Sequence, residues 1–186
     1  MTDSASDEIL MAAYQAGNAQ AFEALFDRHA ASVYGFLVRR LGDEALAEDL
    51  YQEAFLRLHR ARDTYDAERP FRAWLFGIVH NLLNDSLRSR ARTPQTQPLE
   101  DDHPLPDRSP ELLVAERQLG HAVDRAVRTL PADEATVLLL ARFEGLSYDD
   151  IALVVGRTPA AAKQLAYRAL KRVRAELAAR GFRKDP

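Results

Sequence analysis

A cluster of amide, basic and small residues near the C-terminus has the composition of a DNA-reading helix. Gln164 can form two hydrogen bonds with an adenine, and neighbouring alanines can contact a thymine methyl group. Lys163, Arg168 and Lys171 are suited to phosphate oxygens, the groups that position a protein on the duplex. The chemistry available to these residues is recognition: hydrogen bonds to base edges and charge pairing with the backbone.

Two capped helices would present this cluster. Ser147 can cap the first, with Asp150 at its third position, and Gly156 can end it in the left-handed conformation. Thr158 can cap the second, and Pro159 at its first position loses no hydrogen bond. This pattern predicts a helix-turn-helix, whose second helix enters the major groove of DNA. An ordinary helical hairpin is the alternative that these residues alone leave open.

A second group of chemically suggestive residues lies in the segment 43–62. On a helical wheel, one half of this segment is apolar and the other half carries Glu48, Asp49, Gln52 and Glu53, with Leu56 among them. A solvated face explains the acids, and single exposed leucines are common. An apolar side chain inside an acidic stripe nevertheless favours a surface that contacts another protein.

The composition argues against several other classes of protein. The chain has 186 residues, a formal net charge of -3 and no cysteine, which excludes disulfides, a thiolate nucleophile and Cys-ligated zinc. Its histidines lack the i, i+3 or i+4 pairing of a helical metal site, and no phosphate loop or pair of catalytic acids is evident. We therefore expect a protein that is not an enzyme and needs no cofactor or metal. The absence of a long apolar run and of a signal peptide predicts a cytoplasmic location without membrane insertion.

The hydrophobic pattern predicts an all-α fold of two small helical domains. Apolar residues recur with the helical period nearly throughout, and strand signals are absent. Five of the nine prolines fall in residues 93–110 among acidic and polar residues, which predicts a linker between domains at 1–92 and 111–186. Helices are expected at 7–16, 18–41, 43–62, 70–90, 109–129 and 131–143, followed by the helix-turn-helix.

Several motifs in fixed order resemble bacterial sigma factors of the extracytoplasmic-function (ECF) type. The matching segments are 48–58 (EDLYQEAFLRL), 71–75 (FRAWL), 80–81 (HN), 130–131 (LP) and 144–148 (EGLSY). The resemblance covers nearly the whole chain and implies a transcription initiation factor. Such proteins bind core RNA polymerase, and their N-terminal and C-terminal domains recognise the −10 and −35 promoter elements, respectively.

The resemblance also implies roles for individual residues. Polymerase binding falls on Asp49, Gln52, Glu53 and Leu56, which would dock on the clamp coiled coil of the largest subunit. Contacts with the −10 element fall on Tyr65, Asp66, Arg69, Arg72, His80, Asn81, Asn84 and Arg88. Contacts with the −35 element fall on Arg157, Thr158, Ala160, Ala161, Lys163, Gln164, Tyr167, Arg168 and Lys171. Leu165 stands where many members of the family have an arginine, so the preferred −35 sequence stays open.

The expected partners are core RNA polymerase, promoter DNA and an anti-sigma factor. Two rival hypotheses belong to other functional classes. A free-standing helix-turn-helix regulator would bind DNA without polymerase, but it leaves the 48–58 stripe and the linker unexplained. An interaction module with vestigial DNA elements would bind polymerase and yield no promoter-specific transcript.

Overall fold

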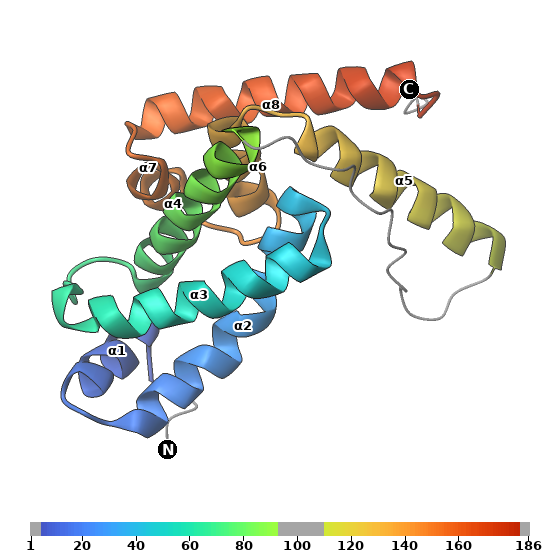
Figure 1. Cartoon of the computed structure of the whole chain (residues 1–186). Helices are drawn as coiled ribbons and strands as arrows, with labels where there is room; N and C mark the ends of the chain where they lie inside the picture. Colours follow the sequence, from blue (N-terminus) through green and yellow to red (C-terminus); the bar gives the residue numbers. More distant parts are fainter. Residues whose placement is uncertain (1–4, 93–109, 183–186) are drawn as a thin grey trace.

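The computed structural model describes residues 5–92 and 110–182, and these residues form helices and turns with no strand. The predicted all-α fold is confirmed. The expected linker, residues 93–110, lies outside the described residues except for Pro110, where a helix begins. The helices (Figure 1) are α1 (Asp7–Gln15), α2 (Ala19–Leu41), α3 (Glu44–Ala61), α4 (Phe71–Arg92), α5 (Pro110–Arg128), α6 (Ala132–Arg142), α7 (Tyr148–Val155) and α8 (Pro159–Ala179), with a 3-10 turn at Arg62–Thr64.

Capping residues set where several of these helices begin and end. The side chains of Ser6, Asn18 and Asp43 each accept a hydrogen bond from a backbone N–H of the first turn that follows. Gly42 ends α2 with φ 65°, a conformation that residues with a Cβ resist. A Cβ at this glycine would also lie 2.5 Å from the guanidinium of Arg128, which belongs to α5. The expected helix boundaries agree with the observed ones to within two residues.

The N-terminal half, α1–α4, is built around aromatic and aliphatic side chains. The ring centroids of Phe36 in α2 and Phe76 in α4 lie 5.6 Å apart, and both side chains are buried. Phe55 of α3 packs against Phe26 of α2 with a centroid distance of 4.8 Å. Edge-to-face and tilted contacts of this kind add to the free energy of apolar burial. The predicted core stripes of α2 and α3 therefore face each other and α4.

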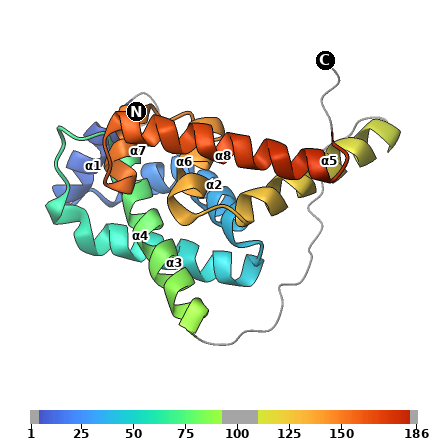
Figure 2. The same ribbon diagram turned by 90° about the horizontal axis from the view of Figure 1, so that it is seen from above.

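In the C-terminal half, α5–α8, α6 forms the centre. Every residue from Glu134 to Leu140 is buried, because α6 is in contact with both α7 and α8. Figure 2 shows α8 lying across α6 and α7. The predicted inner stripe of α8 is buried at Ala162, Ala166, Ala169 and Val173, whereas Leu177, near the end of the helix, is half-buried.

The two halves pack directly against each other. Helix α4 lies beside α7, and α2 lies beside α5 (Figure 1), so that buried side chains of both halves form one continuous cluster. Arg39 of α2 lies over the ring of Phe143 at 4.1 Å, a cation–π contact across this boundary. Local sequence patterns do not predict this packing, which decides how much of α4 faces solvent.

Candidate nucleic-acid interface

The helix-turn-helix has the cap geometry that its sequence predicts. The Ser147 hydroxyl accepts a hydrogen bond from Asp150 N at 3.1 Å and donates one to the Asp150 carboxylate at 2.7 Å. Gly156 ends α7 with φ 63°, and Thr158 Oγ1 accepts from Ala161 N at 3.2 Å at the start of α8. These bonds fix the angle at which α8 leaves the turn.

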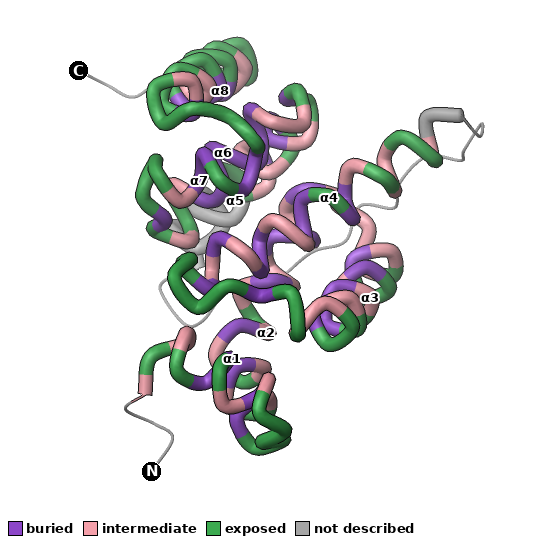
Figure 3. The backbone as a smooth tube through the Cα atoms, turned by 90° about the vertical axis from the view of Figure 1, so that its left-hand side faces the viewer, coloured by how far each residue is buried: buried purple, intermediate pink, exposed green. Residues whose placement is uncertain are grey.

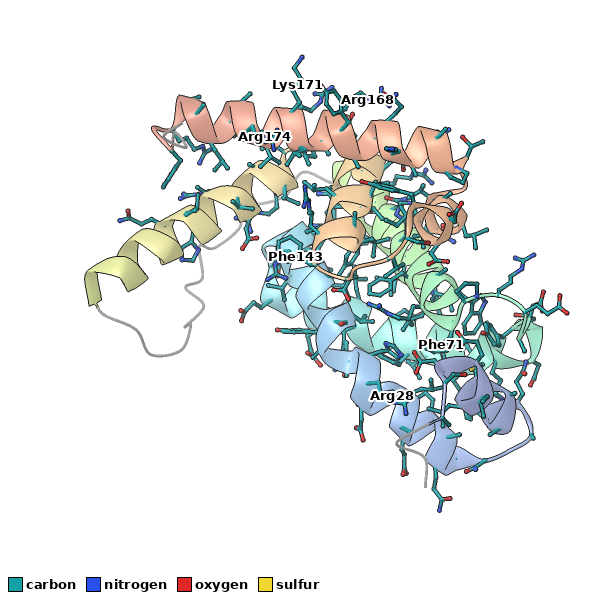
Figure 4. The ribbon with its side chains drawn as sticks, turned by 180° about the vertical axis from the view of Figure 1, so that it is seen from behind. Arg28, Phe71, Phe143, Arg168, Lys171 and Arg174 are labelled. Atoms are coloured by element: carbon teal, nitrogen blue, oxygen red, sulfur yellow. The ribbon has the colours of Figure 1, made fainter. Side chains whose placement is uncertain are left out.

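The side of α8 opposite its buried stripe faces solvent. Tyr167 is 67% exposed, and Lys163, Gln164, Arg168 and Lys171 are also exposed. Figure 3 shows the exposed outer side of α8, and Figure 4 shows Lys171 on the side of α8 away from the other helices. The remaining residues expected at this surface are the exposed Arg157, Thr158 and Ala160 and the half-buried Ala161. An amide and several cations therefore project from one exposed helical face.

A buried carboxylate that the sequence analysis missed holds two of the arginines in this region. The side chain of Glu134 in α6 is only 6% exposed, and its carboxylate lies 3.1 Å from Arg172 Nε and 3.9 Å from Arg168 Nε. Neighbouring Asp133 pairs with Arg157 at 3.0 Å. A buried acid requires a cationic partner, so Glu134 positions both guanidinium groups on α8. The sequence around Glu134, near the start of α6, does not predict this role, because Arg168 and Arg172 lie more than thirty residues further along the chain.

The acidic stripe of α3 lies on the surface, as the helical pattern predicts, although Glu53 is half-buried. Asp49 and Gln52 are exposed, Leu56 is 49% exposed, and the Glu53 carboxylate accepts a hydrogen bond from Arg57 Nε at 2.9 Å. This surface presents one apolar side chain with acids and an amide around it. The arrangement is that of a small protein-binding surface with an apolar centre and a polar rim.

The loop between α3 and α4 is supported from beneath by Tyr65. This residue is 5% exposed, its ring centroid lies 5.0 Å from that of Trp74, and its hydroxyl donates to Arg69 O at 2.6 Å. Burial raises the pKa of Tyr65 to about 12. Asp66 and Arg69 are exposed on the loop, with 3.6 Å between their charged groups. Tyr65 therefore differs from the expected surface residue: the loop folds over its ring.

Two of the residues expected to face DNA are bound by the C-terminal half instead. Arg72 Nη2 donates to Glu144 O at 2.9 Å and lies 3.1 Å from the Glu144 carboxylate. His80 is 5% exposed, with 3.1 Å between its Nδ1 and Thr136 Oγ1. Asn84 Nδ2 lies 3.0 Å from His80 Nε2. An amide nitrogen only donates, so Nε2 accepts and Nδ1 carries the proton of a neutral imidazole.

Burial and charge around His80 favour this neutral form. Burial lowers the pKa of His80 below its ordinary value, and the neighbouring Arg40 and Arg88 act in the same direction. The Asp133 carboxylate, 3.8 Å from Nε2, opposes this shift without reversing it. In the observed packing the His80 side chain is thus an uncharged buried contact.

The opposite side of α4 is open to solvent. Asn81 is exposed and, with Ile78, lines a cavity of about 370 Å³ between α3 and α4. Arg57 and Arg60 of α3 complete this cavity together with Ala61. Sequence reasoning included Asn81 but missed both arginines, because they lie on the preceding helix. The cavity combines cations, one amide and apolar carbon, a combination suited to a nucleotide.

A second cavity, of about 350 Å³, lies where the two halves meet. Arg88, Asn84 and Leu87 of α4 line it together with Arg40 of α2 and Ala132 and Asp133 of α6.

Within residues 5–92 and 110–182, no group of three or more metal-ligating side chains occurs. No helix in the same described part is long and apolar enough to cross a membrane.

Comparison with known proteins identifies both halves of the chain. Residues 25–93 match the family model "Sigma-70 region 2", and residues 120–173 match "Sigma-70, region 4". The chain is 34% identical to the RNA polymerase sigma-H factor of Pseudomonas aeruginosa, over 80% of this chain and 82% of that protein. It is 33% identical to the ECF RNA polymerase sigma factor SigM of Mycobacterium tuberculosis, over 90% of this chain and 83% of the relative.

A solved structure has a similar arrangement of helices. The structure of CnrH in complex with the cytosolic domain of CnrY matches with a TM-score of 0.69 and 28% sequence identity. The match covers 93% of this chain and 97% of the CnrH chain. The sequence and structure comparisons thus agree with each other over most of the length of this chain.

Proposed function

Because the chain belongs to the ECF type of RNA polymerase sigma factors, we propose that its helix α3 docks on core polymerase and that α4, α8 and the loop between α3 and α4 contact promoter DNA. The chain is an alternative sigma factor that directs core RNA polymerase to promoters. Members of this family are initiation factors rather than enzymes, and the proposed mechanism has no catalytic step and no cofactor. The single observation that supports it best is the exposed amide and basic face of α8, opposite four buried small or branched residues.

At the −35 element, α8 lies in the major groove with Gln164 toward the base edges. Lys163 and Lys171 neutralise phosphates, and Arg168 is held at the same surface by Glu134. Arg157 and Thr158 approach the backbone at the turn, while Ala160, Ala161 and Tyr167 supply apolar contact. Leu165 is half-buried beneath this face, so the amide of Gln164 carries the hydrogen-bonding part of base recognition.

At the −10 element, single-stranded DNA runs over the loop and the cavity between α3 and α4. Asp66 and Arg69 on the loop and Asn81 on α4 are exposed, and Arg57 and Arg60 add positive charge beside the cavity. An unstacked base fits such a site because apolar carbon can cover its face while polar groups bind its edge. Tyr65 supports the loop from beneath. Arg72, His80 and Asn84 belong to the same promoter surface once the C-terminal half no longer covers it, and Arg88, one turn after Asn84, is already exposed.

On core polymerase, the clamp coiled coil of the largest subunit receives the α3 surface. Leu56 is the apolar centre of this contact, and Asp49, Gln52 and Glu53 orient it through polar pairs. Such interfaces concentrate binding free energy in a few central side chains surrounded by groups that exclude water.

An anti-sigma factor is the proposed inhibitory partner. The structural neighbour CnrH was solved with the cytosolic domain of another protein bound to it. A partner of this kind would cover the α3 surface and the −10 surface of this chain together. We place the protein in the cytoplasm, where core polymerase acts.

Transcription with purified components tests this function. Bacterial core RNA polymerase is incubated with fragments of the host genome, with and without the chain, and transcript starts are mapped by sequencing. New starts that share upstream −35 and −10 elements are the expected result. DNA binding without core binding would support the free-standing regulator, and core binding without new starts would support the interaction module.

A further inference from the structure

Side chains of helix α1 hold both ends of the loop between α3 and α4. Gln15 Nε2 donates to Arg62 O at 2.8 Å and to Tyr65 O at 2.9 Å, where the loop begins. Glu8 Oε1 accepts from Phe71 N at 3.1 Å, where the loop ends and α4 starts. Figure 1 shows α1 next to this loop. One short helix therefore fixes the backbone on either side of residues 66–70.

The Gln15 amide uses both of its hydrogens at the start of the loop. Its two acceptors are the carbonyl oxygens of Arg62, the first residue of the 3-10 turn, and of Tyr65, the residue after that turn. An amide nitrogen carries two donors, so one side chain can bind both carbonyls at once. Gln15 therefore sets the direction in which the backbone leaves the turn.

Glu8 caps the helix that follows the loop. The N–H of Phe71 is the first of α4, and such a group has no partner within its own helix. Pro70, the preceding residue, has no polar side chain that could cap it. Burial acts to raise the pKa of Glu8, but hydrogen bonds, foremost that from Phe71 N, lower it below its ordinary value. An ionised carboxylate thus lies at the N-terminus of α4, where the helix dipole favours it.

Helix α1 is itself fixed on α2. Asp7 pairs with Arg28 at 2.9 Å and with His29 Nε2 at 2.7 Å. Leu10 and Met11 of α1 are buried, at 3% and 0% exposure. Because α1 cannot shift without breaking these contacts, it provides a rigid support for the two ends of the loop.

The middle of the loop is exposed and is shaped by local bonds. All residues from 66 to 70 are exposed. Asp66 accepts a hydrogen bond from Glu68 N at its carboxylate and one from Arg69 N at its carbonyl oxygen, both at 3.0 Å. Fixed ends and a local turn leave this segment few alternative paths. A loop that is ordered before binding loses less conformational entropy when it binds a ligand.

We propose that α1 positions this loop for −10 DNA, with Gln15 and Glu8 as positioning residues that hold its two ends. The inference rests on the proposed function, in which Asp66 and Arg69 of the loop contact −10 DNA. Gln15 and Glu8 act through the backbone of the loop and touch no DNA themselves. The segment that matches the family model begins at residue 25, after α1 has ended, so this role belongs to residues outside it.

Hydrogen exchange of the full chain tests whether α1 holds the loop. Gln15→Met removes the two donors, and Glu8→Ala removes the acceptor. In both variants the amides of residues 63–69 should exchange about fivefold faster, because one hydrogen bond between an end of the loop and α1 is lost. Glu8→Gln keeps an acceptor oxygen, so its exchange rates should stay within about twofold of the unmodified chain. Unchanged loop exchange in both Gln15→Met and Glu8→Ala would overturn the proposal.

Transcription with core polymerase tests whether the held loop matters for promoter choice. Paired templates differ by one base in the −10 element or by one base in the −35 element. Gln15→Met and Glu8→Ala should lower −10 discrimination about fivefold and leave −35 discrimination unchanged. Glu8→Gln should restore −10 discrimination. An unchanged −10 ratio in both variants, or an equal loss at both elements, would overturn the positioning role.

A matched variant separates positioning from a loss of stability. Asp43→Ala removes the cap of α3 at the end of that helix away from the loop. A protein that is merely less stable yields fewer transcripts from both templates of a pair, and their ratio stays the same. Asp43→Ala should therefore keep −10 discrimination. A fall in this variant as large as in Gln15→Met would overturn the positioning role.

The two hypotheses fail in different ways. If promoter-specific transcripts appear and neither α1 variant alters −10 discrimination, the initiation function stands and the positioning role falls. If the unmodified chain yields no promoter-specific transcripts, the initiation function falls, and the exchange rates alone decide whether α1 holds the loop.

Discussion

Arg72 in α4 and Glu144 after α6 are joined by two contacts from one nitrogen, at 2.9 Å to the Glu144 carbonyl oxygen and 3.1 Å to its carboxylate. The Glu144 side chain is only 8% exposed, whereas that of Arg72 is 37% exposed. The pair links a residue proposed to contact DNA with a residue of the other half of the chain. Its geometry makes the accessibility of the proposed −10 surface a property of tertiary packing.

Replacing Leu56 by aspartate should weaken binding to core polymerase by about 2 kcal/mol or more, which is about thirtyfold in Kd. The reason is that an apolar centre becomes a charge that the interface would have to desolvate. Leu153→Asp is the matched control, because Leu153 of α7 is also exposed, at 57%, but lies away from α3. A binding isotherm with core polymerase measures the difference. An equal loss of affinity for core polymerase in both variants would contradict the placement of Leu56 in the interface.

Gln164→Ala should reduce discrimination at the −35 element by about 1 to 3 kcal/mol, because the amide contributes paired hydrogen bonds to one base. Lys171→Ala should instead weaken binding to all sequences about equally and lower its salt dependence. Competition binding with single-base variants of a mapped −35 element measures both effects. Unchanged base preference in Gln164→Ala would contradict the proposed reading role.

Gly156→Ala should lower the free energy of unfolding by about 1 kcal/mol. At φ 63° an alanine is strained, although there is open space around the position. Gly120→Ala, in the interior of α5 with equally open surroundings, is the control. It should be neutral or stabilising, because alanine favours a helix more than glycine does. Urea unfolding compares the free energies of unfolding of both variants with that of the unmodified chain. A Gly156→Ala protein as stable as the unmodified chain would refute the role of the left-handed cap.

Acidification should destabilise the fold as the pH falls below 6.5, the ordinary pKa of histidine. Burial lowers the pKa of both His29 and His80 in the folded chain. Between pH 6.5 and the lowered pKa values of the folded chain, the unfolded chain therefore binds more protons than the folded one. The contribution of the two histidines to stability is thus present above pH 6.5 and is lost as the pH falls through their pKa values in the folded chain. Glu8 and Asp43, whose pKa values are lowered from 4.5 and 3.8, contribute only at lower pH.

Urea unfolding at neutral pH and at about pH 5 measures this loss. A His29→Gln, His80→Gln double variant should show a shallower dependence over the same range. The charged groups that face His80 are Asp133, Arg40 and Arg88, while Asp7 and Arg28 face His29, with Arg72 also acting on it. Stability that is flat across this range in the unmodified chain would contradict the assignment of neutral, buried histidines.

The amino-acid sequence by itself determined the local structure and the family. Caps at Ser147 and Thr158, the left-handed glycine at 156 and the small-residue stripe of α8 depend on neighbours within one or two helical turns, so their spacing predicts them. The exposed side of α3, with Leu56 among acids, follows from the same periodicity. These features, together with the ordered motifs, were sufficient to identify an all-α sigma factor.

Only the tertiary structure decided which predicted site residues face solvent. Tyr65 lies under its loop, and His80 is buried against Thr136, a residue 56 positions away in sequence. Glu134, which holds Arg168 and Arg172, has no sequence signal that distinguishes it from a surface acid. Helical periodicity assigns residues to the faces of one helix, but it contains no information about which face another helix will cover. Contacts between distant segments arise from the packing of complete helices, and they divided the proposed promoter surface of α4 into one open side and one covered side.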